Sequence, residues 1–169
     1  MTGLHRISKK QGEEFCLLQV NDKAPEFSLP DSEMDLQSLG DFRGHWLVLY
    51  FYPKDNTPSA ITLATDFTEF ETEFNELDTR VVGISPDECF VHQKFIEEHG
   101  ITFSLLADTD REACSDYGVV QDVDGAGAKI VRSTFIIDTK GVVQHVEYGV
   151  NPEGHARLVL KRVASFRNA

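Results

Sequence analysis

The stretch WLVLYFYPKDNTPSA, residues 46–60, decides the fold of this chain. Its first half, residues 46–52, is an uninterrupted apolar run of about the length of one β-strand. Pro53 ends the run, because proline has no amide hydrogen to donate to a neighbouring strand. An apolar run without alternation is typical of a strand that is buried on both faces. We therefore expect this strand to lie in the centre of a sheet, with a polar loop directly after it.

A helix is predicted after the loop. Apolar side chains recur there every three or four residues, at Leu63, Phe67, Phe70, Phe74 and Leu77. This spacing is that of one face of an amphipathic helix that packs on the sheet. We expect position 60 to lie in the first turn of this helix.

The remaining elements alternate along the chain. A strand is predicted at residues 80–84, and after it a helix with Ser85 as N-cap, Pro86 as first residue and Glu88 completing a capping box. Gly100 ends that helix. Further predictions are a strand at residues 103–106, a short helix at 110–117, a hairpin of 133–137 with 142–147, and a last helix with Asn151 as N-cap.

This pattern indicates an α/β fold with a central mixed sheet covered by helices on both faces. Residues 18–169 are expected to form the single domain, because a chain of 169 residues can build one hydrophobic core. Residues 1–17 show no apolar period and are expected to form a flexible extension.

Composition narrows the possible partners. The net charge of -12 argues against nucleic acids, whose phosphates require clustered Lys and Arg. Solubility is the first explanation of this charge, and adaptation to high salt or a basic partner are the alternatives. No apolar run is long enough to span a membrane, and no secretory signal is evident, so we expect a cytoplasmic protein. Three cysteines, Cys16, Cys89 and Cys114, form no CxxC pair and indicate neither a disulfide framework nor a zinc site.

Several segments together resemble one family. Residues 21–30, NDKAPEFSLP, and 41–46, DFRGHW, precede the stretch already quoted, and residues 83–87, GISPD, and 132–138, RSTFIID, follow it. In this order they are similar to the thioredoxin-dependent peroxiredoxins, and among these to the Q type, also called bacterioferritin comigratory protein. The resemblance covers residues 18–166 and implies a thioredoxin-like fold.

The resemblance also implies a site. The family's active loop reads Pro, three residues, Thr, two residues, Cys, which corresponds to Pro53, Thr57 and position 60. Here Ala60 stands where the peroxidatic cysteine is expected. Arg132 is similar to the guanidinium that lowers the thiol pKa, Thr57 to the hydroxyl that bonds the sulfur or the peroxide, and Pro53 to the residue that closes the pocket against water.

Further implications concern partners and the neighbouring helix. Thr65 occupies the position where many Q-type members carry a resolving cysteine. A thioredoxin-like reductase and a hydroperoxide or another small polar ligand are the implied partners, with no cofactor or metal, in a monomer or weak homodimer.

Ala60 has no ionisable group, so the family's cycle cannot run through position 60. No His lies in the loop to activate Thr57. Ser59, Ile61 and Leu63 also depart from the Q-type pattern, which favours natural loss of the site over a single engineered substitution.

We therefore favour a pseudo-peroxidase retained for binding or redox regulation. The alternatives are an active thiol peroxidase, either in a parent sequence with Cys at position 60 or through Cys89, and a structural or chaperone-like protein. Cys89 is a weak candidate, because Asp87 and Glu88 flank it with negative charge.

Two weaker patterns favour solvated surface. Glu88, His92 and His99 share one helix but lack a further metal ligand, so we expect a solvent-exposed helix face. Residues 122–127, DVDGAG, lack the Glu and the helix of a calcium loop, so we expect a mobile loop.

Overall fold

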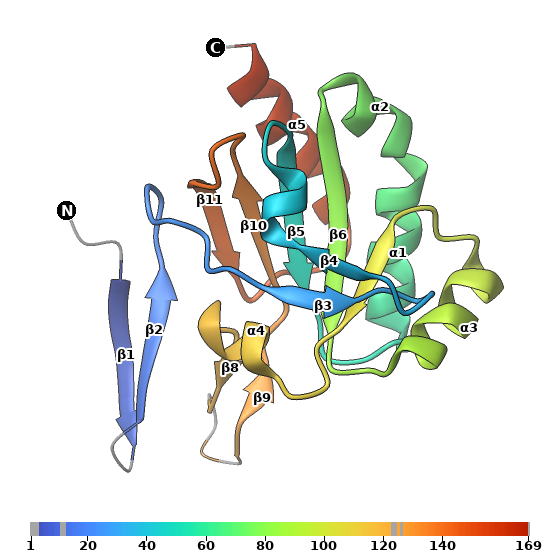
Figure 1. Cartoon of the computed structure of the whole chain (residues 1–169). Coiled ribbons are helices and arrows are strands. Elements are labelled where there is room, and N and C mark those ends of the chain that lie inside the picture. The colour runs from blue at the N-terminus through green and yellow to red at the C-terminus, as the bar shows by residue number, and fades with distance from the viewer. Residues whose placement is uncertain (1–3, 11–12, 123–124, 126, 169) are drawn as a thin grey trace.

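The computed structural model describes residues 4–10, 13–122, 125 and 127–168, and only the backbone of residues 4–10 and 13–16. Its centre is a five-stranded sheet in the order β11-β10-β5-β6-β7 (Figure 1). The strands are β5 (Trp46–Phe51), β6 (Thr79–Ser85), β7 (Ser104–Ala107), β10 (Ser133–Ile137) and β11 (Val143–Tyr148).

The sheet is mixed, as predicted. β5, β6 and β7 run parallel, whereas β10 pairs antiparallel with both β5 and β11. β5 is therefore the central strand, and residues 47–51 are fully buried. Both faces of this strand are covered, as the apolar run without alternation predicted.

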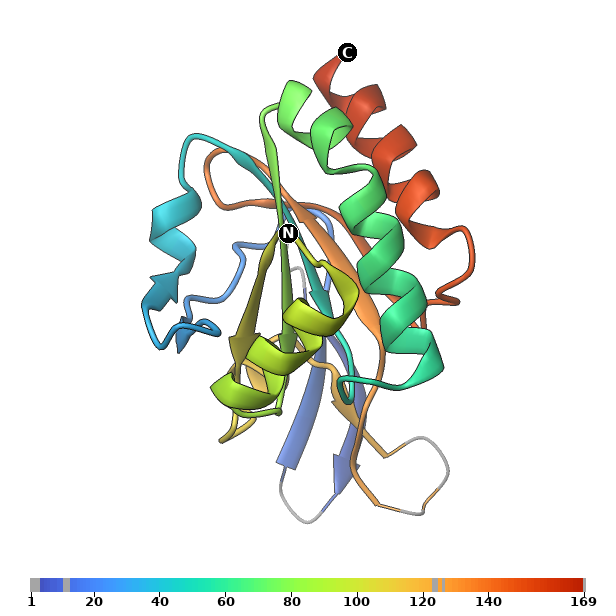
Figure 2. The ribbon, with the colours of Figure 1, turned by 90° about the vertical axis from the view of Figure 1, so that its right-hand side faces the viewer.

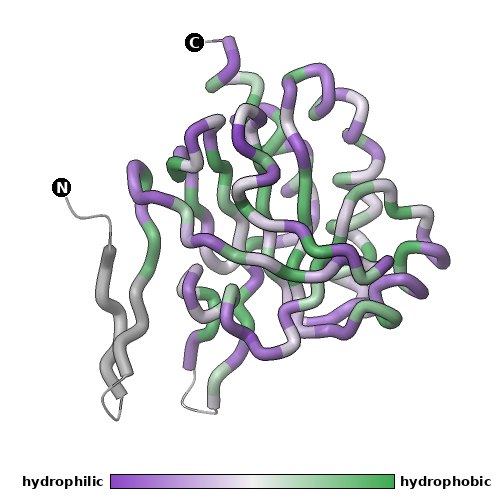
Figure 3. Tube along the Cα trace, viewed as in Figure 1, coloured by the Kyte–Doolittle hydropathy of each residue, from purple (hydrophilic) through white to green (hydrophobic). Residues whose placement is uncertain are grey.

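Alternate residues of β5 enter two different cores. Leu47, Leu49 and Phe51 join the core on one face, and Val48 and Tyr50 join the core on the other. This division follows from the period of two along a strand. Figure 3 shows apolar residues recurring along the central strands.

The longer helices cover the face to which Val48 and Tyr50 point. They are α1 (Pro58–Glu69), α2 (Glu71–Glu76), α3 (Cys89–His99) and α5 (His155–Arg167). Figure 2 shows α1 and α5 side by side, and the two helices are in contact. The opposite face is covered by the short helices η1 (Leu39–Phe42) and α4 (Glu112–Asp116) and by loops.

Four short strands were not predicted. β3 (Ser28–Pro30) pairs antiparallel with β4 (Leu36–Ser38), and β8 (Val120–Gln121) pairs with β9 (Lys129–Ile130). Elements of two or three residues are too short to show a periodic pattern. The loop predicted at residues 122–127 lies between β8 and β9, and residues 123, 124 and 126 are outside the described residues.

The first 17 residues differ from the predicted extension. Their described part contains β1 (Leu4–Lys10) and the start of β2 (Glu13–Leu18), which pair antiparallel in a sheet of their own. At the end of β2, Leu18 is buried in the core, and its amide donates to the Tyr148 hydroxyl at 2.9 Å. The flexibility of this segment stays a prediction, but the described part of its backbone forms β-strands.

Helix boundaries are the other corrections. The helix predicted through residue 77 is interrupted at Phe70, which separates α1 from α2. α3 begins at Cys89 and not at Pro86, because Ser85 is the last residue of β6 and pairs with β7. α5 begins at His155, because the Asn151 side chain accepts the Glu153 amide in a preceding turn.

In the part of the chain that the structure describes, no helix is both long and apolar enough to cross a membrane.

Candidate functional site

The candidate site lies at the carboxyl end of the parallel strands. Residues 52–57 leave β5 at that end and lead directly into α1. In open α/β sheets this edge is where ligands bind, because the loops that follow the strands converge there. The sheet therefore positions the loop that the sequence singled out.

Thr57 is the N-cap of α1, and Ala60 is in its first turn, as predicted. The Thr57 Oγ1 atom accepts a hydrogen bond from the Ala60 amide at 3.2 Å and donates to the Lys54 carbonyl at 3.4 Å. Pro58 is the first helical residue, where its missing amide hydrogen costs nothing. The same hydroxyl that the resemblance assigns to substrate therefore also begins the helix.

Ala60 itself is buried, with 3% of its surface exposed. Its methyl group belongs to the core that also contains Leu63, Ala64 and Phe67 of α1. A methyl group has no lone pair and cannot be ionised. Position 60 therefore carries an apolar methyl group that packs in the core, although it lies at a helix N-terminus, where the helix dipole would stabilise a negative charge.

Thr65 and Pro53 lie on either side of this turn. The Thr65 hydroxyl donates to the carbonyls of Ile61 at 2.7 Å and Thr62 at 3.2 Å within α1, so it is occupied by its own helix. Pro53 is exposed. The shielding of position 60 by Pro53 therefore stays a prediction.

Arg132 borders the end of β5. Its neighbour Ser133 pairs with Phe51, and the Arg132 carbonyl accepts the amides of Gly149 and Val150, each at 2.9 Å. Burial lowers the pKa of the guanidinium, and the nearby Tyr50 opposes this shift. The Arg132 Nε atom is buried without a hydrogen-bond partner among the described residues. Contact between Arg132 and Ala60 stays a prediction.

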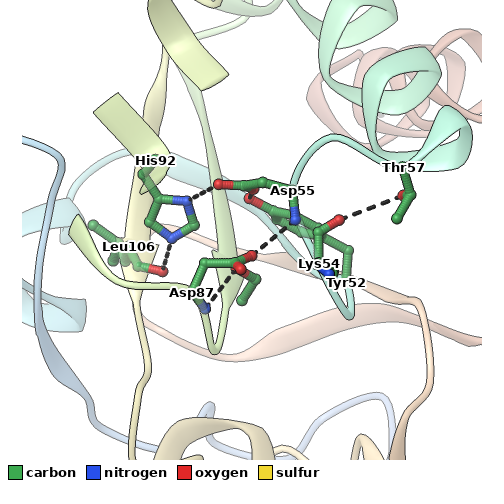
Figure 4. Close-up of polar contacts among 8 residues, drawn as sticks. Tyr52, Lys54, Asp55, Thr57, Asp87, His92 and Leu106 are labelled. Atoms are coloured by element: carbon green, nitrogen blue, oxygen red, sulfur yellow. Dashed lines mark hydrogen bonds and ion pairs between the residues drawn. The ribbon is translucent and has the colours of Figure 1, made fainter. Parts of the chain in front are cut away.

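A buried polar network fixes the middle of the loop (Figure 4). The Asp55 Oδ2 atom lies 2.6 Å from Nδ1 of His92, which is on α3, and the Tyr52 hydroxyl donates to Asp55 Oδ1 at 2.5 Å. The other ring nitrogen of His92 lies 3.1 Å from the Leu106 carbonyl on β7. The loop is thus tied to both α3 and β7 from inside the protein.

His92 therefore contradicts the predicted solvent-exposed helix face. Its side chain has no exposed surface, whereas Glu88 is exposed and His99 is partly exposed. His92 stands one helical turn before the buried Phe95, so the two share the inner face of α3. The spacing of His92 and Phe95 was a signal in the sequence that His92 is buried. A buried histidine requires a polar partner, and Asp55 in the loop is that partner.

The hydrogen bonds of His92 determine its protons. A carbonyl only accepts, so Nε2 of His92 carries a hydrogen in this arrangement. The other ring nitrogen, Nδ1, is engaged by the Asp55 carboxyl at 2.6 Å. With both ring nitrogens engaged, His92 offers no lone pair to a metal ion here, although Asp55, Asp87 and His92 place ligand atoms within 4.8 Å of one another.

Asp87 extends the network to the end of β6. Its Oδ2 atom accepts the Asp55 amide at 2.8 Å and the Ser85 hydroxyl at 2.7 Å. Ser85 is fully buried, so this carboxylate satisfies a hydroxyl that would otherwise have no water to bond. Ser85 thus serves the loop and the sheet, and not the helix start that the sequence predicted.

The cysteines with described side chains lie outside the loop. Cys89 is the first residue of α3, and burial, Asp31 and Glu88 all raise the pKa of its thiol. Cys114 on α4 is fully buried, and burial together with Asp108 raises its pKa far above the ordinary range. Cys16 lies in β2, and its side chain is outside the described residues.

Several proteins that are similar to this chain in sequence are peroxiredoxins. Residues 20–146 match the AhpC/TSA family. The putative peroxiredoxin Bcp of Helicobacter pylori strain 26695 is 42% identical over 147 residues, which are 85% of this chain and 97% of that protein. The peroxiredoxin Bcp of Bacillus subtilis is 38% identical over 127 residues, 73% of this chain and 81% of that protein.

Solved structures agree with these relatives. A PrxQ mutant from Xylella fastidiosa superimposes with a TM-score of 0.83 at 31% identity, covering 88% of this chain and 96% of that one. The bacterioferritin comigratory protein of Xanthomonas campestris, studied for alkyl peroxide reduction, gives a TM-score of 0.81 at 33% identity over 83% of this chain and 92% of that one. The predicted thioredoxin-like α/β fold is confirmed.

Proposed function

This chain belongs to the AhpC/TSA family of peroxiredoxins, and we propose that it is a member without the family's peroxidase cycle, retained to bind a small polar ligand or a redox partner at the loop of Thr57 and Ala60. The observation that carries the proposal is the buried methyl group of Ala60 in the first turn of α1. It occupies the helix N-terminus at which a thiolate would be stabilised.

Peroxide reduction by a thiol requires a nucleophile at this turn. A thiolate attacks one peroxide oxygen, the O–O bond breaks, the sulfur becomes a sulfenic acid and the other oxygen leaves as an alcohol or water. Ala60 can form no bond to oxygen in such a step. Hydrogen-bond donors at this turn, together with the guanidinium that the family resemblance assigns to Arg132, would stabilise a charge that never develops.

The geometry that remains supports binding. The Asp55 and His92 network holds the loop from within without using position 60, so the loop keeps its shape when the sulfur is absent. Arg132 is partly exposed and its Nε atom has no hydrogen-bond partner among the described residues, so an acceptor from a ligand would supply a hydrogen bond to the guanidinium that the protein does not. A hydroperoxide, a carboxylate or the backbone of a reductase partner each presents such an acceptor.

A peroxidase assay with thioredoxin and thioredoxin reductase tests the proposal. The unmodified chain should show no hydroperoxide reduction above the rate without protein. The Ala60→Cys variant should be oxidised by hydroperoxide to a sulfenic acid, seen as one added oxygen at position 60 by mass spectrometry. Its turnover should stay slow, because Thr65 supplies no resolving thiol. The Ala60→Ser variant has similar size without a reactive sulfur and is the matched control.

The competing function is a peroxidase that uses Cys89. Robust reduction of hydroperoxide by the unmodified chain, lost in Cys89→Ser, would establish it and overturn the proposal. The raised pKa of Cys89 argues against this outcome, because only the thiolate attacks peroxide.

A further inference from the structure

A second concavity lies away from the loop of Thr57 and Ala60. It has a volume of about 570 Å³ and is bounded by the β3–β4 turn, the start of α3 and the segment that follows β7. In Figure 1 the β3–β4 turn reaches the side of the molecule where α3 lies. None of the residues 53–60 lines it. A concavity of this size is within the range of binding sites, about 300–1,000 Å³.

Apolar side chains on its walls are exposed. Met34 is 77% exposed and Phe90 is 60% exposed, and both line the cavity with Leu29 and Pro30. Large apolar side chains that gather around one concavity indicate a surface that is covered by a partner. We call this surface the Met34–Phe90 groove and define it by these four residues together with Glu88, Asp110 and Glu112.

The turn that presents Met34 is held in place. The Asp31 carboxylate accepts the amides of Glu33 at 2.9 Å and Asp35 at 3.0 Å, and the Asp31 carbonyl accepts the Met34 amide at 3.0 Å. Met34 is therefore exposed at a fixed position. A partner that binds there would not have to order this wall of the groove first.

The rim of the groove is acidic. Glu88, Asp110 and Glu112 are exposed, and among the described residues that line the groove none is basic. Asp108 also lines it but is buried, where it accepts the amides of Ala113 and Cys114 at the start of α4. Three exposed carboxylates around an apolar wall create a negative potential that attracts cations and repels anions.

We propose that the Met34–Phe90 groove docks a partner protein through a basic segment that carries at least one large apolar side chain. The apolar side chain packs between Met34 and Phe90, and flanking Lys or Arg side chains pair with Glu88, Asp110 and Glu112. The proposal does not depend on the function proposed at position 60, because the two surfaces share no residue.

Charge distinguishes this occupant from others. Nucleic acids and anionic membrane surfaces would be repelled by the carboxylates. A second copy of this chain carries the same net charge of -12 and would bring like charges together. A basic segment gains from both the apolar walls and the acidic rim, and its binding should weaken with added salt.

Amide NMR titration of the full chain with a synthetic peptide is the test. The probe is Gly-Lys-Lys-Leu-Phe-Lys-Lys-Gly, and the matched control peptide has Glu in place of each Lys. We expect the Lys peptide to shift amides of the groove residues selectively and the Glu peptide to shift none of them. The Phe90→Ser and Met34→Ser variants should each lower the affinity about tenfold or more, as central apolar contacts do.

Matched variants separate the groove from general attraction to an acidic protein. Leu158→Ser removes an exposed apolar side chain on α5, outside the groove, and should change the affinity less than about twofold. Replacing Asp110 and Glu112 by Asn and Gln should weaken binding and reduce its salt dependence. The same amide changes at Glu97 and Glu98, which are exposed near the other end of α3, should have little effect.

Three results would overturn the proposal. The first is that the groove amides do not shift at millimolar Lys peptide. The second is that the shifts are spread evenly over the protein surface and that the control variants lose as much affinity for the Lys peptide as the groove variants do. The third is a shift of the groove amides with protein concentration alone, which would show that a second copy covers the groove. The amide spectra also report whether each variant is folded.

Discussion

The Nδ1 atom of His92 lies 2.6 Å from the Oδ2 atom of Asp55, and neither side chain has any surface exposed to solvent. This contact joins the loop after β5 to the inner face of α3, 37 residues later in the chain. Tyr52 and the Leu106 carbonyl complete the hydrogen bonds of the pair. The conformation of the loop that leads from β5 into α1 therefore depends on His92, a residue of another helix.

Replacing Asp55 by Asn should destabilise the protein strongly. The substitution removes one partner of a buried pair and leaves the imidazole opposite an amide, a change that costs roughly 3–5 kcal/mol in buried ion pairs. Urea unfolding followed by circular dichroism measures the free energy of unfolding. Asp78→Asn is the matched control, because Asp78 pairs with His45 at 2.7 Å but the pair is partly exposed to solvent. Similar losses in the two variants would contradict the structural role of the buried pair.

Replacing Gly83 by Ala should also destabilise the protein, for a steric reason. A Cβ atom at position 83 on β6 would lie 2.8 Å from both the Tyr50 Cζ atom and the Leu105 Cδ2 atom, in a fully packed core. Overpacking of this kind costs typically about 1–3 kcal/mol.

Gly40→Ala provides the control for Gly83→Ala. Beyond the neighbouring residues of the chain, no heavy atom lies within 4 Å of the place that a Cβ would take at Gly40, so the free energy of unfolding of this variant should stay within about 0.5 kcal/mol of the unmodified chain. Thermal and urea unfolding of both variants measure the free energy of unfolding. They distinguish a steric clash at position 83 from a general effect of replacing glycine. Equal changes in the two variants would refute the packing argument.

Local patterns predicted the elements around the site. The apolar run of residues 46–52 indicated β5, and the spacing from Leu63 to Leu77 indicated the helical region that follows. Ala60 lies in the first turn of α1, because Thr57 and Pro58 favour a helix start there. These features depend on neighbours in the chain, so the sequence alone displays them.

Contacts between distant segments could not be predicted in this way. Ser85 has the residue type of an N-cap, but pairing of β6 with β7 keeps it in the sheet, and α3 starts later. The burial of His92 depends on Asp55 and on the Leu106 carbonyl, which approach it only in the folded chain. The Met34–Phe90 groove likewise joins three segments that are distant in the sequence, and one of them, the β3–β4 turn, lies between strands too short to show a periodic pattern.

The free energy of unfolding should fall as the pH decreases below about 6.5, the ordinary pKa of histidine. Burial lowers the pKa of His155 at the start of α5, with His145 adding to the shift and Glu147 opposing it. The unfolded chain then binds the proton first, so stability is complete above the ordinary pKa and is lost as the pH falls toward the folded-state pKa.

The His155→Gln variant tests this assignment. Its amide can keep a hydrogen bond to the Thr134 hydroxyl, which lies 2.8 Å from Nε2 of His155, but it does not titrate. Urea unfolding between about pH 5 and pH 7.5 should show a weaker pH dependence in the variant. Some dependence should remain, because burial also lowers the pKa of His145. An unchanged slope would assign the effect to other groups.

Cys89 should be alkylated slowly at neutral pH, although it begins a helix. A helix N-terminus favours the thiolate, but burial raises the thiol pKa, and the carboxylates of Asp31 and Glu88 raise it further. The rate of reaction with iodoacetamide, followed on the peptide that contains Cys89, should therefore still be rising above pH ~8.5, where a free thiol is half ionised. The Glu88→Gln variant should react faster at each pH, because it removes one of these negative charges.

The buried Cys114 should react only after unfolding and serves as the internal control. Rapid labelling of Cys89 at about pH 6 would instead identify an activated thiol, and the peroxide chemistry that Ala60 cannot perform would then have a second candidate nucleophile.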